Sequence, residues 1–218
     1  MNTLVKYISI LAISLTVSLN TSNVKLSSVL ALTDSELREK LDNIYFFGIY
    51  DKQSNERAEY ENKEIFFLNE ADAKKTLAGI HSKSPESSES VYIVRYSLEI
   101  LRSKNDILYI PDLEEVNTAE NLAKASPQPY QGGIPLYVSK VNDNYTILEK
   151  DSGEEIIPFF FKKQHLDSFM ADMRAKNPEL ANGVKTEVVS FNNLIEILEN
   201  NDNLILKKIQ IIPYYWQP

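Results

Sequence analysis

The chain has 218 residues, of which 43% are hydrophobic and 25% charged, a composition typical of a globular protein. Its formal net charge is -8 at pH 7. Surplus acidic side chains repel phosphate backbones and anionic lipid, which argues against nucleic-acid binding and leaves at most peripheral membrane contact. The absence of cysteine excludes disulfides, thiolate metal sites and redox chemistry by the protein itself.

Residues 1–31 have the pattern of a secretory signal peptide. They contain two lysines, no acidic residue and the apolar run YISILAISLTV. A run of about eleven residues is shorter than the roughly twenty that a membrane-spanning helix needs, so a permanent anchor is the weaker interpretation. Losing this segment would change the balance from 23 basic and 31 acidic side chains to 21 and 31, a net charge of -10. We therefore expect an exported, acidic protein.

The next segment, residues 32–112, is predicted to be an α+β unit. The runs YFFGIY and EIFFL are separated by a polar stretch rich in turn-forming residues, which predicts strand, turn and strand. Apolar residues between Ala73 and Ile80 then follow helical spacing, and Asn69 is placed to cap the helix. This helix should end before Pro85. The strand VYIVRYSL, a short helical turn and the strand ILYIPD complete the unit.

Residues 113–132 are predicted to link this unit to the next. The sequence LEEVNTAENLAKA predicts a helix from Leu113 to Ala125. The stretch SPQPYQGG that follows is rich in proline and glycine, which makes it the best candidate for a boundary.

The last segment, residues 133–218, is predicted to repeat the order of the first unit. The strands IPLYV and EIIPFFF precede a helix that should end before Pro178. The apolar residues of this helix lie at positions i, i+3, i+4 and i+7: Leu166, Phe169, Met170 and Met173. The strand VKTEVVSF, a short helical turn and the strand IQIIPYYW follow.

The two units are also similar in sequence. A shift of 93 positions aligns residues 66–101 with residues 159–194 without a gap, and nine of the 36 aligned positions are identical. Composition alone predicts roughly two identities. We therefore predict an ancient duplication and an α+β fold. It would consist of two pseudo-symmetric repeats, each β-β-α-β-short α-β, with mostly antiparallel sheets and helices packed on them.

Aromatic residues are abundant, with twelve Tyr, nine Phe and one Trp. Most must lie in the core. Side chains alternate faces along a strand, so Phe160 should point away from Phe159 and Phe161, and we expect Phe159 or Phe160, but not both, to be available outside the core. Five aromatics are candidates for a surface that binds other proteins, with the alternative that they are core: Phe47, Tyr137, Phe160, Tyr214 and Trp216.

The sequence offers no support for catalysis. The only histidines, His81 and His165, do not correspond under the 93-residue shift, and we expect them to be exposed polar residues instead of metal ligands. Neither G-x-S-x-G, G-x-G-x-x-G nor a Walker loop occurs, and the carboxylates are scattered. We therefore expect a protein that is not an enzyme and uses no cofactor or metal.

Several motifs resemble the twenty-two-kilodalton subunit family of the chloroplast inner-envelope translocon, which includes cyanobacterial periplasmic relatives. The stretch YQGGIPLYV resembles that family's Gly-Ile/Val-Pro opening of its second half. The Phe-rich strand FFF, the helix ending in Asn-Pro, and the strand VKTEVVS follow in the family's order. The stretch ILYIPDLEEVNTAENLAKA is similar to its Ile/Val-Pro-Asp segment and following helix. The first unit departs from the pattern, because IYFFGIYDKQ lacks the usual Val-Pro pair.

This resemblance implies a two-winged protein with apolar pockets, located between two membranes. It implies a periplasmic location, with a thylakoid lumen or a plastid intermembrane space as alternatives. It further implies a chaperone-like factor for protein import or outer-membrane biogenesis, which binds unfolded precursor or outer-membrane proteins through apolar grooves without ATP. An Omp85-type barrel is the implied partner.

A second interpretation of the residues stays open. A groove built of Phe, Tyr and Met would serve equally as a binding module for a small apolar ligand or for one fixed protein partner. An uncharacterised hydrolase is the third and weakest interpretation, since only the abundance of carboxylates favours it.

Overall fold

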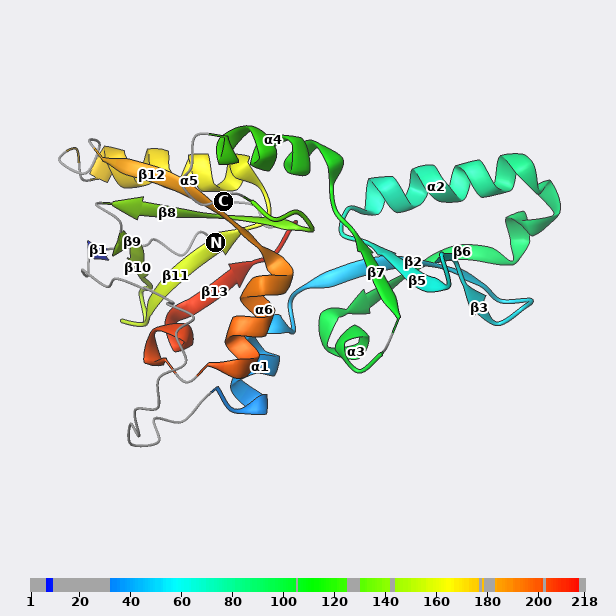
Figure 1. Cartoon of the computed structure of the whole chain (residues 1–218), viewed down its shortest axis with the longest axis horizontal. Helices are drawn as coiled ribbons and strands as arrows, with labels where there is room; N and C mark the ends of the chain where they lie inside the picture. The colour runs from blue at the N-terminus through cyan, green and yellow to red at the C-terminus, as the bar shows by residue number, and fades with distance from the viewer. Residues whose placement is uncertain are drawn as a thin grey trace.

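The structure is a computed structural model that describes residues 7–9, 32–104, 106–124, 130–141, 144–176, 178, 183–201 and 203–215. Two sheets lie side by side along the long axis of the molecule, with helices on both faces (Figure 1). The predicted signal peptide lies outside the described residues, except for the short strand β1 (Tyr7–Ser9). Among the described residues, no helix is long and apolar enough to cross a membrane.

The first unit is built on a sheet whose main strands lie in the order β6-β2-β5-β7. Only the β5 to β7 pairing is parallel. The strands are β2 (Tyr45–Asp51), β3 (Glu56–Arg57), β4 (Glu59–Tyr60), β5 (Lys63–Phe67), β6 (Val91–Ser97) and β7 (Ile107–Ile110). The helices are α2 (Glu70–Lys83), the 3-10 helix η1 (Pro85–Glu89) and α3 (Leu98–Arg102). Helix α2 covers one face of the sheet, and α3 lies on the other side (Figure 1).

The second unit has the corresponding order β12-β8-β11-β13, again with one parallel pairing, between β11 and β13. Its strands are β8 (Pro135–Val141), β9 (Asn144–Tyr145), β10 (Ile147–Glu149), β11 (Glu155–Phe160), β12 (Val184–Ser190) and β13 (Ile209–Ile212). Its helices are α5 (Lys163–Lys176), α6 (Phe191–Asn200) and the 3-10 helix η3 (Leu204–Lys208). Strand β10 also pairs with β1.

The α+β fold class is confirmed, and the predicted strands and main helices occur at their expected positions. One length was underestimated: the short helical turn of the second unit is the ten-residue helix α6. Its apolar residues Phe191, Leu194 and Leu198 repeat at helical spacing and are all buried, so the core supports more than two turns. A twofold relation between the units, their common origin and the proposed domain boundaries stay predictions.

Two further helices join the units. Helix α1 (Asp34–Leu41) begins at Thr33, which forms a reciprocal capping box with Glu36, and it buries Leu37 and Leu41. Helix α4 (Leu113–Ala123) follows the first unit as predicted, begins at the capping side chain of Asp112 and ends at Ala123.

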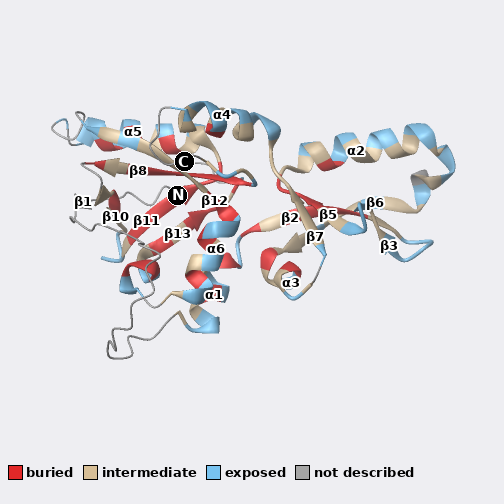
Figure 2. Ribbon diagram, in the orientation of Figure 1, coloured by how far each residue is buried: buried red, intermediate tan, exposed pale blue. Residues whose placement is uncertain are grey.

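The apolar core extends through both units. The largest cluster lies between helices α1, α3 and α6 and the lower sheet faces, which are the faces turned away from α2 and α5. It contains Phe46 and Phe66 of the first unit with Phe159 and Phe161 of the second. Two smaller clusters lie under α2 and under α4 with α5. Figure 2 shows this buried interior in red along both sheets. Phe160 lies in the cluster under α5, so the predicted alternation of the three phenylalanines is confirmed.

Candidate functional site

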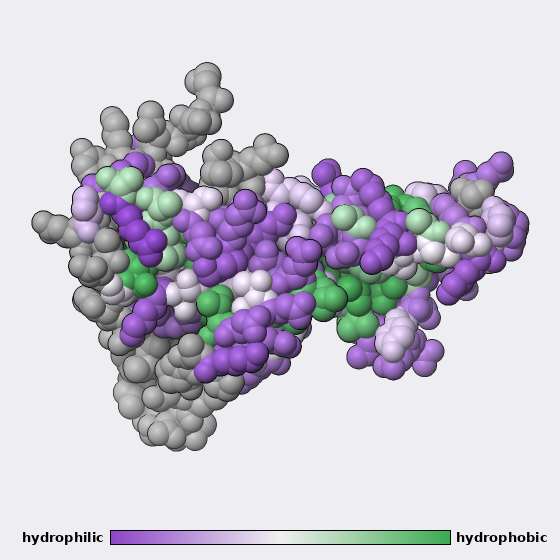
Figure 3. All heavy atoms as spheres, turned by 90° about the horizontal axis from the view of Figure 1, so that it is seen from above, coloured by the Kyte–Doolittle hydropathy of each residue, from purple (hydrophilic) through white to green (hydrophobic). Residues whose placement is uncertain are grey.

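An open groove lies where the first sheet meets the C-terminal segment of the chain. Its volume is about 770 Å³. Much of its wall is apolar and aromatic, with contributions from both units: Tyr45, Phe47, Leu68, Phe161, Tyr214 and Tyr215. Seen from above, apolar surface gathers on the first unit beside α2, between more polar regions (Figure 3). An open apolar hollow of this kind is a usual place for a bound chain or ligand.

The C-terminal segment forms one wall of the groove and is attached to the first unit through Tyr215. The ring of Tyr215 packs edge-on against Phe47, with 5.9 Å between ring centroids. Its hydroxyl oxygen accepts a hydrogen bond of 2.6 Å from the backbone N–H of Glu70, the first residue of α2. Tyr215 therefore satisfies one of the free N–H groups that every helix start leaves, although its side chain is half exposed.

Asp112 ties the same segment to two helix starts. One carboxylate oxygen accepts a bond of 2.9 Å from the N–H of Glu114 and caps α4. The other accepts from the hydroxyl of Tyr214 and, at 3.2 Å, from the side-chain amide of Asn69, which caps α2. Burial and the bond to Asp112 raise the pKa of Tyr214, so its hydroxyl stays protonated and donates. Asp112 thus connects the C-terminal wall of the groove to the starts of α2 and α4.

Charged side chains line part of the groove rim. Lys74 forms an ion pair of 2.8 Å with Glu70 one helical turn earlier. Arg95 is exposed, and its guanidinium carbon lies 4.5 Å from the centroid of the Tyr45 ring, a cation-π contact. Among the described residues, no carboxylate forms an ion pair with Arg95. One cation on this rim is therefore available to an acidic group.

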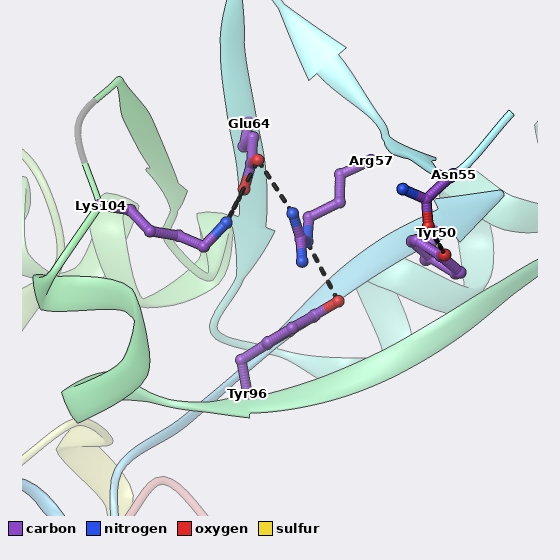
Figure 4. Close-up of polar contacts among 6 residues, drawn as sticks. All are labelled: Tyr50, Asn55, Arg57, Glu64, Tyr96 and Lys104. Carbon is purple, nitrogen blue, oxygen red and sulfur yellow. Dashed lines mark hydrogen bonds and ion pairs between the residues drawn. The ribbon is translucent and has the colours of Figure 1, made fainter. Parts of the chain in front are cut away.

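A polar network lies on the lower face of the first sheet, where its side chains converge (Figure 4). Glu64 accepts from Arg57 and from Lys104, each at 3.0 Å. Arg57 also donates at 3.1 Å to the hydroxyl of Tyr96, and this bond raises the pKa of the guanidinium. Because each charge here has a partner and all are partly solvated, the network fixes strands β3 and β5 and the turn after α3 and presents no reactive group.

A second cavity, of about 390 Å³, lies in the second unit. Its apolar lining includes Phe159 and Leu194, while a polar group formed by Lys140, Tyr145 and Glu187 also lines it. The hydroxyl of Tyr145 donates to Glu187 at 3.2 Å, and the Lys140 ammonium lies 4.4 Å from the centroid of its ring and pairs with Glu187. Burial, followed by Glu187, raises the pKa of Tyr145. This cavity could hold a small apolar molecule with one polar end.

The histidines occupy structural positions. Nε2 of His81 lies 3.1 Å from the carbonyl oxygen of Val91, at the start of β6. Burial, followed by the charge of Lys162, lowers the pKa of His165. Both residues are half-buried, so the expectation that they are exposed is wrong. Among the described residues, no group of three or more His, Cys, Asp or Glu could hold a metal ion.

The five aromatic candidates separate into three groups. Phe47 and Tyr214 line the groove, although both are largely buried. Tyr137 and Phe160 face each other across β8 and β11 in the cluster under α5, with 0% and 2% exposure, so they are core residues in this state. Trp216 lies outside the described residues.

Phe159 is also only 2% exposed, so the expectation that Phe159 or Phe160 is available outside the core is wrong. Both faces of β11 are covered, one by the shared core and the other by α4 and α5.

Sequence reasoning missed Tyr45, Arg95 and Tyr215 as parts of the groove. Strand alternation could have placed Tyr45 with Phe47 and Arg95 with Ile93 on one face, because the pairing of β2 with β6 brings these residues together. No sequence signal places Tyr215 against the start of α2, since that contact joins residues 145 positions apart.

Comparisons with known proteins agree on one family. The model of the Tic22-like family matches residues 9–214. Among solved structures, Anabaena Tic22, described as a protein of protein transport, superposes with a TM-score of 0.69 and 16% identity, over 84% of this chain and 94% of that chain. Tic22 from Plasmodium falciparum superposes with a TM-score of 0.61 and 20% identity, over 81% and 91%. At these identities the two structures show a shared fold. A search of curated proteins finds no match.

Proposed function

The chain belongs to the Tic22-like family, and from this premise we propose that it binds unfolded precursor or outer-membrane proteins during protein transport. It does so through the groove beside α2, without ATP and without catalysing a reaction. The description of Anabaena Tic22 as a protein of protein transport supports the process. The groove, which is apolar, open and built by both units, is the observation that carries the mode of binding.

The physical basis is the match between the groove and an unfolded chain. An unfolded segment exposes apolar side chains that folding would otherwise bury, and an apolar hollow covers them without a sequence-specific contact. The acidic surface, with a net charge of -8, keeps a complex with such a segment soluble. Binding of this kind is weak for each contact and needs no nucleotide.

Location and partners belong to the same proposal. The leader pattern in residues 1–31 supports export, with the periplasm as the proposed compartment and the thylakoid lumen or a plastid intermembrane space as alternatives. An Omp85-type barrel is the proposed partner that receives the client.

Light scattering of an aggregating substrate protein, with and without the purified full chain, tests this function. We expect suppression at about stoichiometric amounts. Tyr45→Lys replaces an aromatic ring of the groove with a further cation beside Arg95 and should weaken suppression. Tyr92→Lys is the matched control, because Tyr92 is exposed on the opposite face of the same sheet. No suppression by the unmodified chain, or equal effects of the two variants in folded protein, would count against the proposal.

The cavity of the second unit favours a second candidate function, the binding of a small apolar ligand. Its apolar side chains and its Lys140, Tyr145 and Glu187 group suit a molecule with one polar end. Native mass spectrometry of protein purified from its own host distinguishes the two functions. A single bound mass that disappears in the Leu194→Trp variant would favour binding of a small ligand. A chain that carries no bound mass would favour binding of client proteins.

A further inference from the structure

Strand β6 is an edge of the first sheet, and part of its backbone has no partner. Two backbone hydrogen bonds mark the ends of its pairing with β2. The N–H of Lys52 donates to the carbonyl of Ser90 at 3.0 Å, and the N–H of Leu98 donates to the carbonyl of Ile44 at 2.9 Å. Bonded residues alternate in an antiparallel pair, so the even-numbered residues of β6 bond to β2. The backbone N–H and C=O groups of Ile93 and Arg95 point outward, and no described residue bonds to them.

The unpaired residues are the ones that line the groove. The side chains of Ile93 and Arg95 form part of its wall, and none of the seven residues of β6 is buried. A strand added outside β6 would therefore pair with Ile93 and Arg95. Its alternate side chains would lie on the groove side of the sheet.

We infer that an extended segment of a client protein pairs with the outer edge of β6 as an additional strand and carries an acidic side chain opposite Arg95. The alternating N–H and C=O groups select a strand, since no side chain could satisfy them in that pattern. Arg95 selects the charge, because its guanidinium contacts the Tyr45 ring and pairs with no described carboxylate, whereas Lys74 on the same rim is already paired with Glu70. This inference rests on the proposed function and names the mode by which that groove takes a client.

A probe peptide tests the pairing directly. It has the length of β6, is capped at both ends, alternates valine with threonine and carries one glutamate at a central valine position. Its binding to the full chain is measured by fluorescence anisotropy. One version is N-methylated at the valine and glutamate positions and another at the threonine positions. We expect one methylated version to bind at least about tenfold more weakly and the other to bind like the parent, because only alternate N–H groups of an added strand face β6.

Hydrogen exchange gives the matching result on the protein. The amides of Ile93 and Arg95 should exchange fast in the free chain and become protected by the probe. The amide of Val94, which already bonds to β2, should change little.

Variants test the edge and the charge separately. Ile93→Pro removes an outward N–H at a position where an edge strand tolerates proline, and should weaken binding of the probe about tenfold. Ile93→Val is its control. Arg95→Glu should weaken binding of the glutamate probe by a similar factor and strengthen binding of a probe with lysine at that position. Amide exchange across β2 shows that each variant is folded.

Four results would overturn the inference: no binding of the probe, equal sensitivity to both methylation patterns, protection at β7 instead of β6, or a dimer of the chain joined through β6. Each is separate from the proposed function, which stands or fails on the suppression of aggregation.

Discussion

Replacing Gly48 with alanine should destabilise the first unit through one methyl group. Gly48 lies in the middle of β2, directly over the lower face of the sheet. A Cβ there would lie 2.9 Å from Cε1 and 3.1 Å from Cδ1 of Phe66, and 3.0 Å from Cε2 of Tyr96. Carbon atoms in cores normally approach to about 3.5–4.0 Å, so at least one ring must move by several tenths of an ångström.

Neither ring is free to move. Phe66 is fully buried, and it packs edge-on against Tyr96 with 5.2 Å between centroids. The hydroxyl of Tyr96 is also held by Arg57 at 3.1 Å. Overpacking of this kind costs about 1–3 kcal/mol. The loss of unfolded-chain freedom on replacing glycine returns about 0.4–1 kcal/mol, so we expect Gly48→Ala to lower the free energy of unfolding by roughly 1–2 kcal/mol.

Gly79→Ala is the matched control. Gly79 lies inside α2, and an added Cβ there would meet no atom within 4 Å. Alanine is favoured over glycine in a helix by about 0.8–1 kcal/mol, so the same chemical change should raise the free energy of unfolding by about that amount. Urea titrations followed by circular dichroism compare the two. Effects of the same sign at both positions would refute the packing argument.

Three further predictions concern hydrogen bonds and charge. Tyr137→Phe removes the hydroxyl that donates at 2.7 Å to the carbonyl of Glu115 in α4, and should lower the free energy of unfolding in urea by about 1 kcal/mol; an unchanged midpoint would contradict this. Glu36 accepts from Lys207 and from Thr33, which lower its pKa from 4.5 to about 2, so the carboxylate stabilises the fold above pH 4.5 and this contribution is lost as the pH falls through about 2. Glu36→Gln should flatten the fall of stability across that window in a pH series of unfolding curves, and an unchanged slope would contradict it. Tyr215→Phe keeps the ring in the groove but removes the acceptor for the first N–H of α2, so thermal unfolding should show a loss of about 0.5–1 kcal/mol of stability. Aggregation suppression should stay unaltered. A loss of suppression would show that the hydroxyl itself contacts clients.

Local patterns were enough to predict the elements of the fold. Helix α2 begins after the capping Asn69 and ends before Pro85, because a side-chain cap and the restriction that precedes proline both act within a few residues. The opposed directions of Phe159 and Phe160 follow from strand geometry alone. The 93-residue shift, added to these local patterns, predicted that the second unit follows the element order of the first.

The site was harder to predict because it depends on distant contacts. Period-two alternation places Phe47 on one face of β2 but says nothing of what covers that face. Coverage depends on where α2, α4 and the C-terminal segment come to lie. The bond from Tyr214 to Asp112 joins residues 102 positions apart, and no local signal encodes it. Tyr137 and Phe160 were candidates for the same reason, since only the position of α5 shows that they are core.

The two units use one element order but differ in how completely they close. Helix α5 buries Leu166, Met170 and Met173. At the corresponding positions of α2, Ala73 is buried and the other two residues are only half-buried.

Helix α4 also lies beside α5 over the second sheet, whereas in the described part of the chain no second α-helix lies alongside α2 over the first sheet (Figure 1). Smaller side chains and a missing helix leave apolar surface uncovered on the first unit, where the groove and the unpaired edge of β6 are found. Under the proposed function, the first unit therefore binds the client. The second unit contributes the buried apolar area that keeps the whole chain folded while the first unit leaves apolar surface exposed.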